Sequence, residues 1–381
     1  MKKVVFASFA KFPRGDSNAI HFVNIGTIFL NLGYEVHFVG FGNEDFNDEF
    51  GEYHSLKTVK SKNNIVAKVL NHLNMEKKVA VFLMKKFADA DVIIFSDCLN
   101  KKWFRKIADF YSKVNPKSKL IISMTEEYEK DEFDKMDYFA KRGLKRNQYL
   151  NNDFNDKRFR FICISKFLEA KFKNRGFKTI YLPFTFSNSF IGTICQKEHD
   201  CINFIYTGSP NNKDRLLLIL KAFSLIEQKG FCLSVVGVDE KWIKDRDNDT
   251  FQKIKHFTTF FGRKEYEFVR SVYETADFSL LLRDPNKTFT KAGCPTKIVE
   301  SLFFGVPPIT NLTGDLKDFL IDMDNSIIVK DCSAESFAFS VERALMQSDN
   351  LQVMKCNAKE TAQTHLESSK YIDKIVEILD N

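Results

Sequence analysis

The residues best suited to do chemistry lie in one stretch of the C-terminal half, residues 292–316. A predicted helix begins there with Pro295 at its first position, where the missing N–H costs no hydrogen bond. The N-terminus of a helix exposes unpaired N–H groups and the positive end of the helix dipole, so it suits a phosphate, and Lys297 stands in the first turn. Glu300 follows Pro295 by five residues (300 − 295), about a turn and a half further on. Its carboxylate could accept two hydrogen bonds from a vicinal diol such as a ribose, so one helix would hold both ends of a nucleoside diphosphate.

Two further cations follow predicted strands. Strand 202–207 runs into Gly208-Ser209-Pro210-Asn211-Asn212-Lys213-Asp214 and then a helix. Such a turn lets the backbone approach a phosphate while Lys213 supplies a counter-charge; alternatively, Lys213 is a solvated residue at the start of a helix. Strand 276–283 ends in Arg283, whose guanidinium could bind a phosphate in a bidentate manner.

The pattern Ala-Gly-x-Pro-Thr-Lys-x-x-Glu-Ser-Leu, followed by Gly-x-Pro and an Asn-x-Thr turn, resembles the nucleotide-sugar site of the retaining glycosyltransferases of family 4, fold type B, of the bacterial surface-polysaccharide type. In that family a Glu-x7-Glu pair is common, with the second Glu on the ribose and the first near the sugar. Glu300 matches the second. The first would stand at 292 (300 − 8), where this chain has Ala292, so its role is not carried over. The alternative interpretation is a capped helix packed on a sheet, with Glu300 solvated.

The resemblance implies transfer of a glycosyl group from a nucleoside-diphosphate sugar to a glycan or lipid-linked acceptor, with retention of configuration and without metal or cofactor. Lys213 and Arg283 would be catalytic by stabilising the leaving diphosphate, and the turn at Gly262 and Arg263 would lie beside the nucleobase. The implied nucleotide-sugar residues are Gly208, Ser209, Pro210, Lys213, Gly262, Arg263, Arg283, Gly293, Pro295, Thr296, Lys297, Glu300 and Thr313. A nucleotide-sugar epimerase or hydrolase of the same fold remains an alternative, as does a non-catalytic partner protein, which Ala292 favours.

The acceptor is expected on the N-terminal half. The loop after the first strand contains Arg14, Ser17 and Asn18, and the family resemblance implies that this loop helps to shape the cleft; a plain connection fits equally well. Glu126 and Glu127 follow strand 120–125 and are candidates for acid/base catalysis or acceptor binding. Alternatively, they are ordinary acidic residues at the start of a helix.

The order of elements predicts an α/β fold. Strand 4–9, helix 19–32 and strand 35–40 form a βαβ unit, which implies a parallel sheet with a right-handed crossover. At 381 residues the chain exceeds one hydrophobic core. We therefore expect the GT-B arrangement, two Rossmann-like domains with parallel sheets facing a central cleft. The expected ranges are 1–183 for the acceptor-side domain, 184–200 for a linker, 201–360 for the nucleotide-sugar domain and 361–381 for a helix crossing back to the first domain. Residues 43–90 are expected to be helical, as are 333–348 and 351–380.

The composition of the chain limits the classes of ligand that it is expected to bind. The net charge of +7, from 57 basic and 50 acidic residues, suits an anionic ligand or membrane surface, and no nucleic-acid-binding signature is present. Eight scattered Cys indicate a reducing compartment, and the seven His are isolated along the sequence, so no zinc site is expected. Asp89-Ala90-Asp91 has the form of a metal motif but precedes its strand, so we expect no metal there.

The protein is expected to be cytoplasmic, because no apolar run of about 18 residues is present. Two basic clusters, residues 101–106 and 141–146, lie in the acceptor-side half, and the first contains Trp103. Anionic headgroups attract such clusters, which predicts a peripheral position at the inner face of the plasma membrane. Solvated helix faces are the alternative for both clusters.

Overall fold

The computed structural model describes residues 1–42, 44–57, 64–129, 132, 138–191, 201–210, 213–228, 230–347 and 349–380, without the side chains of 64–73 and 138–139. Residues 192–200 of the expected linker, and Asn211 and Asn212 of the predicted phosphate turn, lie outside these ranges. The chain divides into two compact units: unit 1 is Met1–Ser187 with Ser368–Asn381, and unit 2 is Asn188–Glu367. Each unit contains a largely parallel sheet, so the predicted two-domain α/β fold is confirmed.

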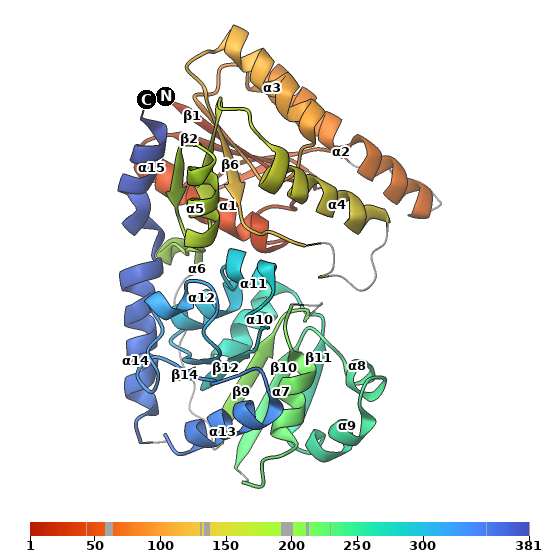
Figure 1. The fold of residues 1–381 in the computed structure, drawn as a ribbon, viewed down its shortest axis with the longest axis vertical. Coiled ribbons are helices and arrows are strands. Elements are labelled where there is room, and N and C mark those ends of the chain that lie inside the picture. Colours follow the sequence, from red (N-terminus) through yellow and green to blue (C-terminus); the bar gives the residue numbers. More distant parts are fainter. Residues whose placement is uncertain are drawn as a thin grey trace. The chain divides into compact units, whose positions relative to one another are not determined.

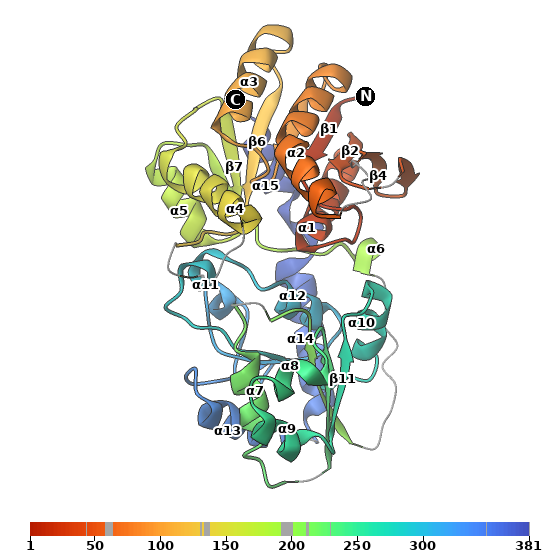
Figure 2. The same cartoon turned by 90° about the vertical axis from the view of Figure 1, so that its right-hand side faces the viewer.

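Unit 1 is built on an eight-stranded sheet of order β3-β4-β2-β1-β5-β6-β7-β8, labelled in part in Figure 1. All neighbouring strands are parallel except β3 and β4. The strands are β1 (Lys3–Ala7), β2 (Glu35–Gly40), β3 (Phe46–Asp48), β4 (Gly51–Ser55), β5 (Val92–Phe95), β6 (Lys119–Met124), β7 (Phe159–Cys163) and β8 (Thr179–Tyr181). The helices are α1 (Ser17–Asn31), α2 (Asn64–Lys86), α3 (Lys101–Val114), α4 (Tyr138–Gln148), α5 (Lys166–Asn174) and α15 (Ile372–Leu379). Figures 1 and 2 show α2 and α3 side by side.

Phenylalanine rings fill much of the unit 1 core. Phe6 on β1 packs against Phe22 and Phe29 of α1 and Phe38 of β2, with ring centroids 5.2–5.9 Å apart. Each of these rings is fully buried, and burying an aromatic side chain is a large hydrophobic gain. The many Phe residues of the sequence therefore have a structural role in joining helix and sheet.

The expectation of helix throughout residues 43–90 is wrong, because β3 and β4 form a hairpin before α2 begins. Gly51 opens β4 directly after the turn, with φ +144°, and a Cβ there would lie 2.5 Å from the Val36 carbonyl oxygen. Only glycine fits this close approach of β4 to β2. The short polar segment Asn47–Glu49 followed by a glycine two residues later was the available sign of a turn.

The same strand pairing corrects a second expectation, that the histidines are isolated. Strands β2 and β4 run parallel with His37 opposite Glu52 and Val39 opposite His54. His37 and His54 are 17 residues apart in sequence, yet their rings lie within hydrogen-bond distance. Asp89 and Asp91 both accept hydrogen bonds from Lys3 at 2.8 Å.

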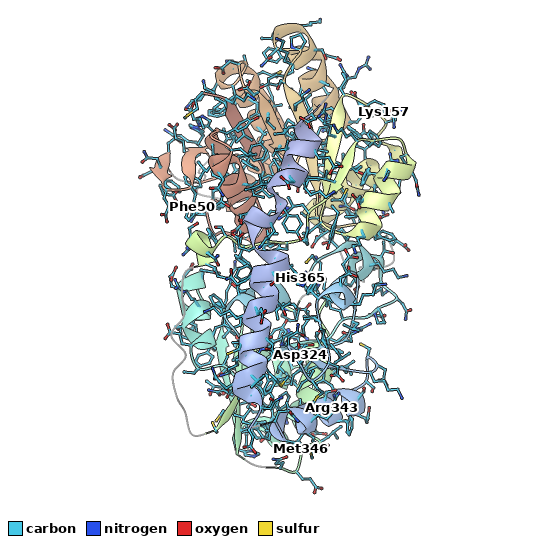
Figure 3. The ribbon with its side chains drawn as sticks, turned by 90° about the vertical axis from the view of Figure 1, so that its left-hand side faces the viewer. Phe50, Lys157, Asp324, Arg343, Met346 and His365 are labelled. Carbon is cyan, nitrogen blue, oxygen red and sulfur yellow. The ribbon has the colours of Figure 1, made fainter. Side chains whose placement is uncertain are left out.

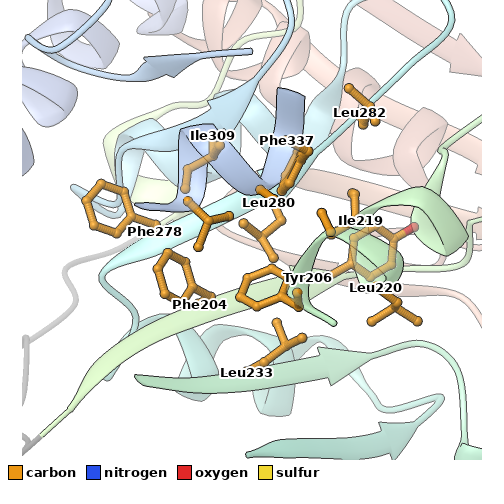
Figure 4. Packing of buried hydrophobic residues seen from close by; sticks show 14 of the residues in the cluster. Phe204, Tyr206, Ile219, Leu220, Leu233, Phe278, Leu280, Leu282, Ile309 and Phe337 are labelled. Atoms are coloured by element: carbon orange, nitrogen blue, oxygen red, sulfur yellow. The ribbon is translucent and has the colours of Figure 1, made fainter. Parts of the chain in front are cut away.

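Unit 2 has a six-stranded, fully parallel sheet of order β11-β10-β9-β12-β13-β14. Its strands are β9 (Ile202–Thr207), β10 (Phe231–Val236), β11 (Thr258–Gly262), β12 (Phe278–Leu281), β13 (Pro308–Thr310) and β14 (Ile327–Ile328). Figure 4 shows the core on this sheet, where Phe204 and Phe278 stack with centroids 5.7 Å apart. The strands are thus buried among apolar side chains, as parallel sheets require.

The helices of unit 2 are α6 (Asn188–Ile191), α7 (Leu216–Phe223), α8 (Glu240–Lys244), α9 (Asn248–Ile254), α10 (Tyr266–Tyr273), α11 (Thr288–Ala292), α12 (Thr296–Phe303), α13 (Ala334–Leu345) and α14 (Leu351–Thr361). Helices α8 and α9 were not expected. Asp239 and Asp247 cap them by accepting hydrogen bonds from the backbone of Trp242 and Thr250, a signal present in the sequence.

The expectation of one helix over 351–380 is also wrong. Helix α14 continues as a π-helical turn (Ala362–Leu366), and the chain is extended at Glu367 before α15 (Figure 3). Ser368 N–H then donates to the Phe186 carbonyl at 3.0 Å, and the Ser368 hydroxyl lies 3.1 Å from that of Thr27. These tertiary hydrogen bonds within unit 1 override a local helical preference. They place the last 14 residues, Ser368–Asn381, in unit 1.

Candidate functional site

Most of the predicted site residues lie in unit 2, at the carboxyl edge of its parallel sheet. Strands β9 and β10 end beside Gly208 and Gly237, whose φ angles are +93° and +118°. Gly208 N–H donates to the Val236 carbonyl and Gly237 N–H to the Gly262 carbonyl, both at 2.8 Å. A Cβ on Gly237 would lie 2.4 Å from the Gly208 oxygen, so no other residue fits. Ligands of open α/β sheets bind at this edge.

Asp214 is the centre of the charge arrangement at this edge. Its Oδ1 accepts from Arg283 Nε at 2.9 Å, and its Oδ2 accepts from the Tyr206 hydroxyl at 2.9 Å. Lys297 Nζ donates to the same Oδ2 and to the Tyr206 hydroxyl, and lies 4.1 Å from the centre of the Tyr206 ring. The first turn of α12, the turn after β9 and the end of β12 are therefore joined through one carboxylate.

Electrostatics fix the protonation of this cluster. Burial raises the pKa of Asp214, but the charges of Lys297 and Arg283 outweigh it and lower that pKa to about 2. Burial lowers the pKa of Lys297, and the Asp214 carboxylate opposes that shift. Burial, with Asp214 adding to it, raises the pKa of Tyr206 well above its usual value. The cluster thus carries two cations on one anion, a net positive charge suited to a diphosphate.

Arg283 is held in place from both sides. Asn311 Oδ1 accepts from the Arg283 backbone N–H at 3.1 Å, and Asn311 Nδ2 donates to its carbonyl at 2.7 Å. Asp214 takes Nε. Among the residues that the structure describes, the two terminal Nη nitrogens have no hydrogen-bond partner. This leaves the outer edge of the guanidinium for bidentate binding of a phosphate.

Glu300 is buried on α12, with 7% of its surface exposed, so the alternative of a solvated Glu300 is wrong. Burial raises its pKa to about 7, against the smaller lowering effects of a hydrogen bond from Tyr266 and of the Lys297 charge. Tyr273 lies near it, and burial together with the Glu300 charge raises the pKa of that tyrosine well above its usual value. A buried carboxyl poised between charged and neutral forms marks a candidate binding or catalytic group.

The start of α12 differs by one residue from the prediction. Pro295 is the N-cap of the helix, with ψ 104°, and the helix itself begins at Thr296. The preceding loop packs against the turn at Thr313, where Gly314 has φ +54° and a Cβ would lie 3.2 Å from the Gly293 oxygen. Gly293, Pro295 and Thr313 are all buried, so they position the helix start.

The other predicted residues of unit 2 are close in sequence to the cluster of Asp214, Lys297 and Arg283. Lys213, partly exposed, directly precedes Asp214, while Ser209 and Arg263 are exposed. Prediction missed Asp214, Tyr206, Tyr266 and Asn311 as site residues. The sequence did offer one signal, an acidic residue directly after the phosphate turn.

The predicted residues of unit 1 lie on other elements. Ser17 and Asn18 open α1, whose N-cap Asp16 accepts from Ala19 N–H at 2.9 Å, and Arg14 lies in the preceding turn. These positions are exposed or half-buried at the carboxyl end of β1.

Glu126 and Glu127 follow β6, and residues 125–129 are not helical, so the alternative of acidic residues opening a helix is wrong. The Glu127 carboxylate forms an ion pair with Lys171 Nζ at 2.5 Å, and the Glu126 carbonyl accepts from Asn147 Nδ2 at 2.9 Å. Because Lys171 already neutralises the Glu127 carboxylate, this ion pair disfavours Glu127 as an acid/base group.

Comparison with known proteins agrees with this geometry. Residues 202–347 match the family described as Glycosyl transferases group 1. Sucrose-phosphate synthase from Thermosynechococcus elongatus superposes with a TM-score of 0.74 at 12% identity, covering 99% of this chain and 98% of that one. Anabaena HepE in complex with UDP and glucose gives 0.67 at 12% identity, covering 100% and 99%. WaaG, a glycosyltransferase involved in lipopolysaccharide biosynthesis, gives 0.64 at 14%, covering 99% and 100%. No curated protein sequence matches significantly.

These relatives share the GT-B fold, which is therefore the fold of this chain. The family match identifies residues 202–347 as a domain of the Glycosyl transferases group 1 family, which supports a glycosyltransferase. Within the described part of the chain, no helix is both long and apolar enough to cross a membrane.

Replacing Asp214 by Asn keeps the shape but leaves Lys297 and Arg283 as partly buried cations without a counter-charge. We expect the free energy of unfolding at pH 7 to fall by about 3 kcal/mol, measured by urea denaturation. Glu240→Gln removes an exposed carboxylate paired with Lys244 at 2.6 Å and should cost less than about 1 kcal/mol. Equal losses in the two variants would contradict a central role for Asp214.

The same variant has a pH signature. In the fold the pKa of Asp214, about 2, lies below its ordinary 3.8, so its stabilisation is complete above pH 4 and is lost as pH falls towards 2. The wild-type protein should lose about 2 kcal/mol from this group over that window. Asp214→Asn should lack this loss, so the two stabilities should converge in acid.

Proposed function

We propose that this protein transfers a sugar from a nucleoside-diphosphate sugar to a glycan or lipid-linked acceptor, with retention of configuration and without metal or cofactor. The observation that carries the proposal is the buried cluster of Lys297, Asp214 and Arg283 next to Glu300, inside the matched domain. We further propose a role in cell-surface polysaccharide synthesis and a family 4 origin, on the resemblance of residues 292–316.

The donor would bind with its diphosphate against Arg283, Lys297 and the N-terminus of α12, with Lys213 adding charge from the turn after β9. When the glycosidic bond breaks, negative charge accumulates on the leaving diphosphate. Cations fixed before the reaction stabilise that charge without reorganising. Asp214 is then a positioning residue, because it holds both cations while the outer edge of Arg283 faces the ligand.

Glu300 would accept hydrogen bonds from the ribose hydroxyls, and the turn at Gly262 and Arg263 would lie at the base. Anabaena HepE was solved with UDP and glucose, which supports a uridine nucleotide as the first donor to test. Position 292, where the family has its first Glu, is occupied by a fully buried alanine, so this chain has no carboxylate there. Retention here rests on the resemblance, and the sugar must be oriented by other groups.

The acceptor would be bound by unit 1, where a groove of about 770 Å³ lies between β4 and α2. Its apolar lining is Leu56, Val81 and Phe82. Its rim is basic and consists of Lys57, Lys77, Lys78, Lys85 and Lys86. An apolar floor with a cationic rim suits an anionic amphiphile such as a lipid-linked phosphate. We therefore propose a cytoplasmic enzyme that works peripherally at an anionic membrane surface.

The two basic clusters differ in how well they serve that role. On α3, Lys106 Nζ lies 4.9 Å from the Trp103 ring centre, and Arg105 is 80% exposed. On α4, Arg142 and Arg146 turn to the buried carboxylate of Glu76, at 3.1 and 3.4 Å. The reading of cluster 141–146 as a wholly solvated face is therefore wrong, and α3 is the better membrane contact.

The direct test is mass-spectrometric detection of product from a panel of nucleotide sugars with lipid-linked acceptors. Glycosylated acceptor is the expected outcome. Sugar release or a new nucleotide sugar without acceptor would establish the hydrolase or epimerase alternative. Nucleotide binding without any turnover would favour a non-catalytic partner, the alternative that Ala292 supports.

Glu300→Gln retains the shape of the side chain but loses the charged acceptor, so nucleotide binding should weaken by about 1.5–3 kcal/mol at pH 8. Because the pKa of Glu300 is about 7, the wild-type carboxyl is largely neutral at pH 6 and ionised at pH 8. Ionisation of Glu300 should therefore raise wild-type affinity over this range by up to about tenfold, and the variant should lack this contribution. Calorimetry with UDP and GDP measures both effects, with Glu240→Gln as the control. Unchanged affinity would remove Glu300 from the site.

Transfer should survive excess EDTA, because Arg283, Lys297 and Lys213 supply the positive charge that a metal would otherwise bring to the diphosphate. The measurement is product formation with and without chelator. Complete loss that Mg²⁺ or Mn²⁺ restores would show that the donor is bound through a metal.

Salt-sensitive binding to anionic vesicles is expected, by about 1 kcal/mol per basic residue near the surface. Changing Lys101, Lys102, Arg105 and Lys106 to Glu should weaken co-sedimentation. The same charge change at Lys241, Lys244, Lys253 and Lys255 in unit 2 should not. If the wild-type protein ignores such vesicles at low salt, the acceptor is soluble and the peripheral placement is wrong.

A further inference from the structure

Two histidines and a glutamate meet at the edge of the unit 1 sheet. Glu52 and His54 lie two residues apart on β4 and so share a face, and the parallel register places His37 of β2 beside them. His37 Nδ1 is 3.2 Å from His54 Nε2 and 3.5 Å from Glu52 Oε2, and His54 Nε2 is 3.8 Å from the same oxygen. Three groups that commonly bind metals therefore converge with one ligand atom each.

We propose that His37, His54 and Glu52 bind a zinc-like divalent cation. A triangle with sides of 3.2, 3.5 and 3.8 Å has its centre about 2.0 Å from each corner, close to Zn–N and Zn–O bond lengths of about 2.0–2.2 Å. One ion placed near this centre reaches all three atoms without movement of the strands. Two imidazoles and one carboxylate favour zinc, copper or nickel over magnesium or calcium, which prefer oxygen ligands.

The surroundings of His37 fit a ligand. Glu35 Oε1 lies 3.2 Å from His37 Nε2, the ring nitrogen that does not face the site. The negative charge of this carboxylate favours a proton on Nε2, which leaves the lone pair of Nδ1 for the ion; a carboxylate beside the outer nitrogen is common around metal-bound histidines. His37 and His54 are 4% and 5% exposed, and the ring of Phe87 packs on both, with centroids 4.9 and 5.2 Å away.

Lys86 is the group that competes with the ion. Its Nζ lies 3.1 Å from His54 Nδ1. Without metal, hydrogen bonds can run from Lys86 to His54 and from His54 to His37. With metal on Nε2, His54 must carry its proton on Nδ1, directed at the ammonium, so Lys86 has to turn away. Lys86 lines the groove between β4 and α2, where its long side chain has room to do so.

The site is separate from the proposed donor chemistry, because it lies in unit 1 and joins β4 to β2. Glu52 is 53% exposed, so a water molecule can complete a four-coordinate ion from the solvent side. The ion would tie the edge hairpin to the sheet and so adjust the stability of the wall of the lysine-rimmed groove.

The test is titration of chelator-treated, reduced protein with ZnCl₂, followed by competition with a chromophoric chelator and by the thermal unfolding temperature. One ion per chain and a raised unfolding temperature are expected. His54→Gln should weaken binding by more than the roughly 10–100-fold typical of an outer-shell change. His256→Gln, which removes an exposed histidine of unit 2, should change nothing.

Lys86→Gln gives a test that does not depend on a damaged core. The amide oxygen of Gln can accept the Nδ1 proton of metal-bound His54, so this variant should bind zinc about 10-fold more tightly, within the range of outer-shell effects. No binding by the wild-type protein at micromolar zinc, or equal binding by wild type, His54→Gln and Lys86→Gln, would overturn the proposal. Magnesium and manganese distinguish this site from a metal requirement of the transfer reaction. We expect neither ion to occupy the site or to be needed for transfer. If either ion restored activity after chelation, the result would concern binding of the donor and not this site.

Discussion

The ion pairs of Asp214 with Lys297 and Arg283 are the interaction on which the site of unit 2 depends. Two cations this close repel each other, and each loses hydration on burial, so neither could stay in place alone. Asp214 is buried, with 8% of its surface exposed, and remains charged because both cations contact it. It offsets only one of the two positive charges. The remaining positive charge lies at the carboxyl edge of the sheet, where Arg283 presents its outer nitrogens. The cations that would bind a phosphate are therefore in position before any ligand binds.

The backbone makes this arrangement possible. Gly208 and Gly237 allow the ends of β9 and β10 to approach so closely that a Cβ on either would meet a neighbour within 3 Å. At Gly208 that neighbour is Cε of Lys297, which crosses above the glycine on its way to Asp214. A side chain at this position would displace the lysine as well as strain the turn. Glycine here therefore serves the electrostatics of the site and not only the geometry of the loop.

The sequence was informative where the signal is local and repeated. Apolar strands followed by helices predicted a parallel sheet, and β2 has the predicted bounds, Glu35–Gly40. Arg283 could be assigned to the carboxyl edge of the sheet from the end of its strand, and Lys297 and Glu300 to one helix from their spacing after Pro295. What failed depends on register between distant segments. The pairing of β2 with β4 brings His37 to His54, and no spacing along the chain shows it. Likewise, the break before α15 follows from hydrogen bonds to Phe186 and Thr27, which lie far away in sequence.

Asp214 and Glu300 lie in similar surroundings, but their carboxyl groups differ in what they can do. Both carboxyls are buried at the same edge of the sheet, and burial raises the pKa of each. They differ in their cations: two contact Asp214, whereas Glu300 has no ion pair among the residues that the structure describes. Asp214 is therefore charged at any physiological pH and acts as a fixed counter-ion. Glu300, with a pKa of about 7, can change its charge near neutral pH, and a neutral donor such as a ribose hydroxyl can stabilise its charged form. A carboxylate that is neutralised by cations of its own protein can only support a site, whereas a buried carboxyl without such an ion pair can gain stabilisation from a ligand.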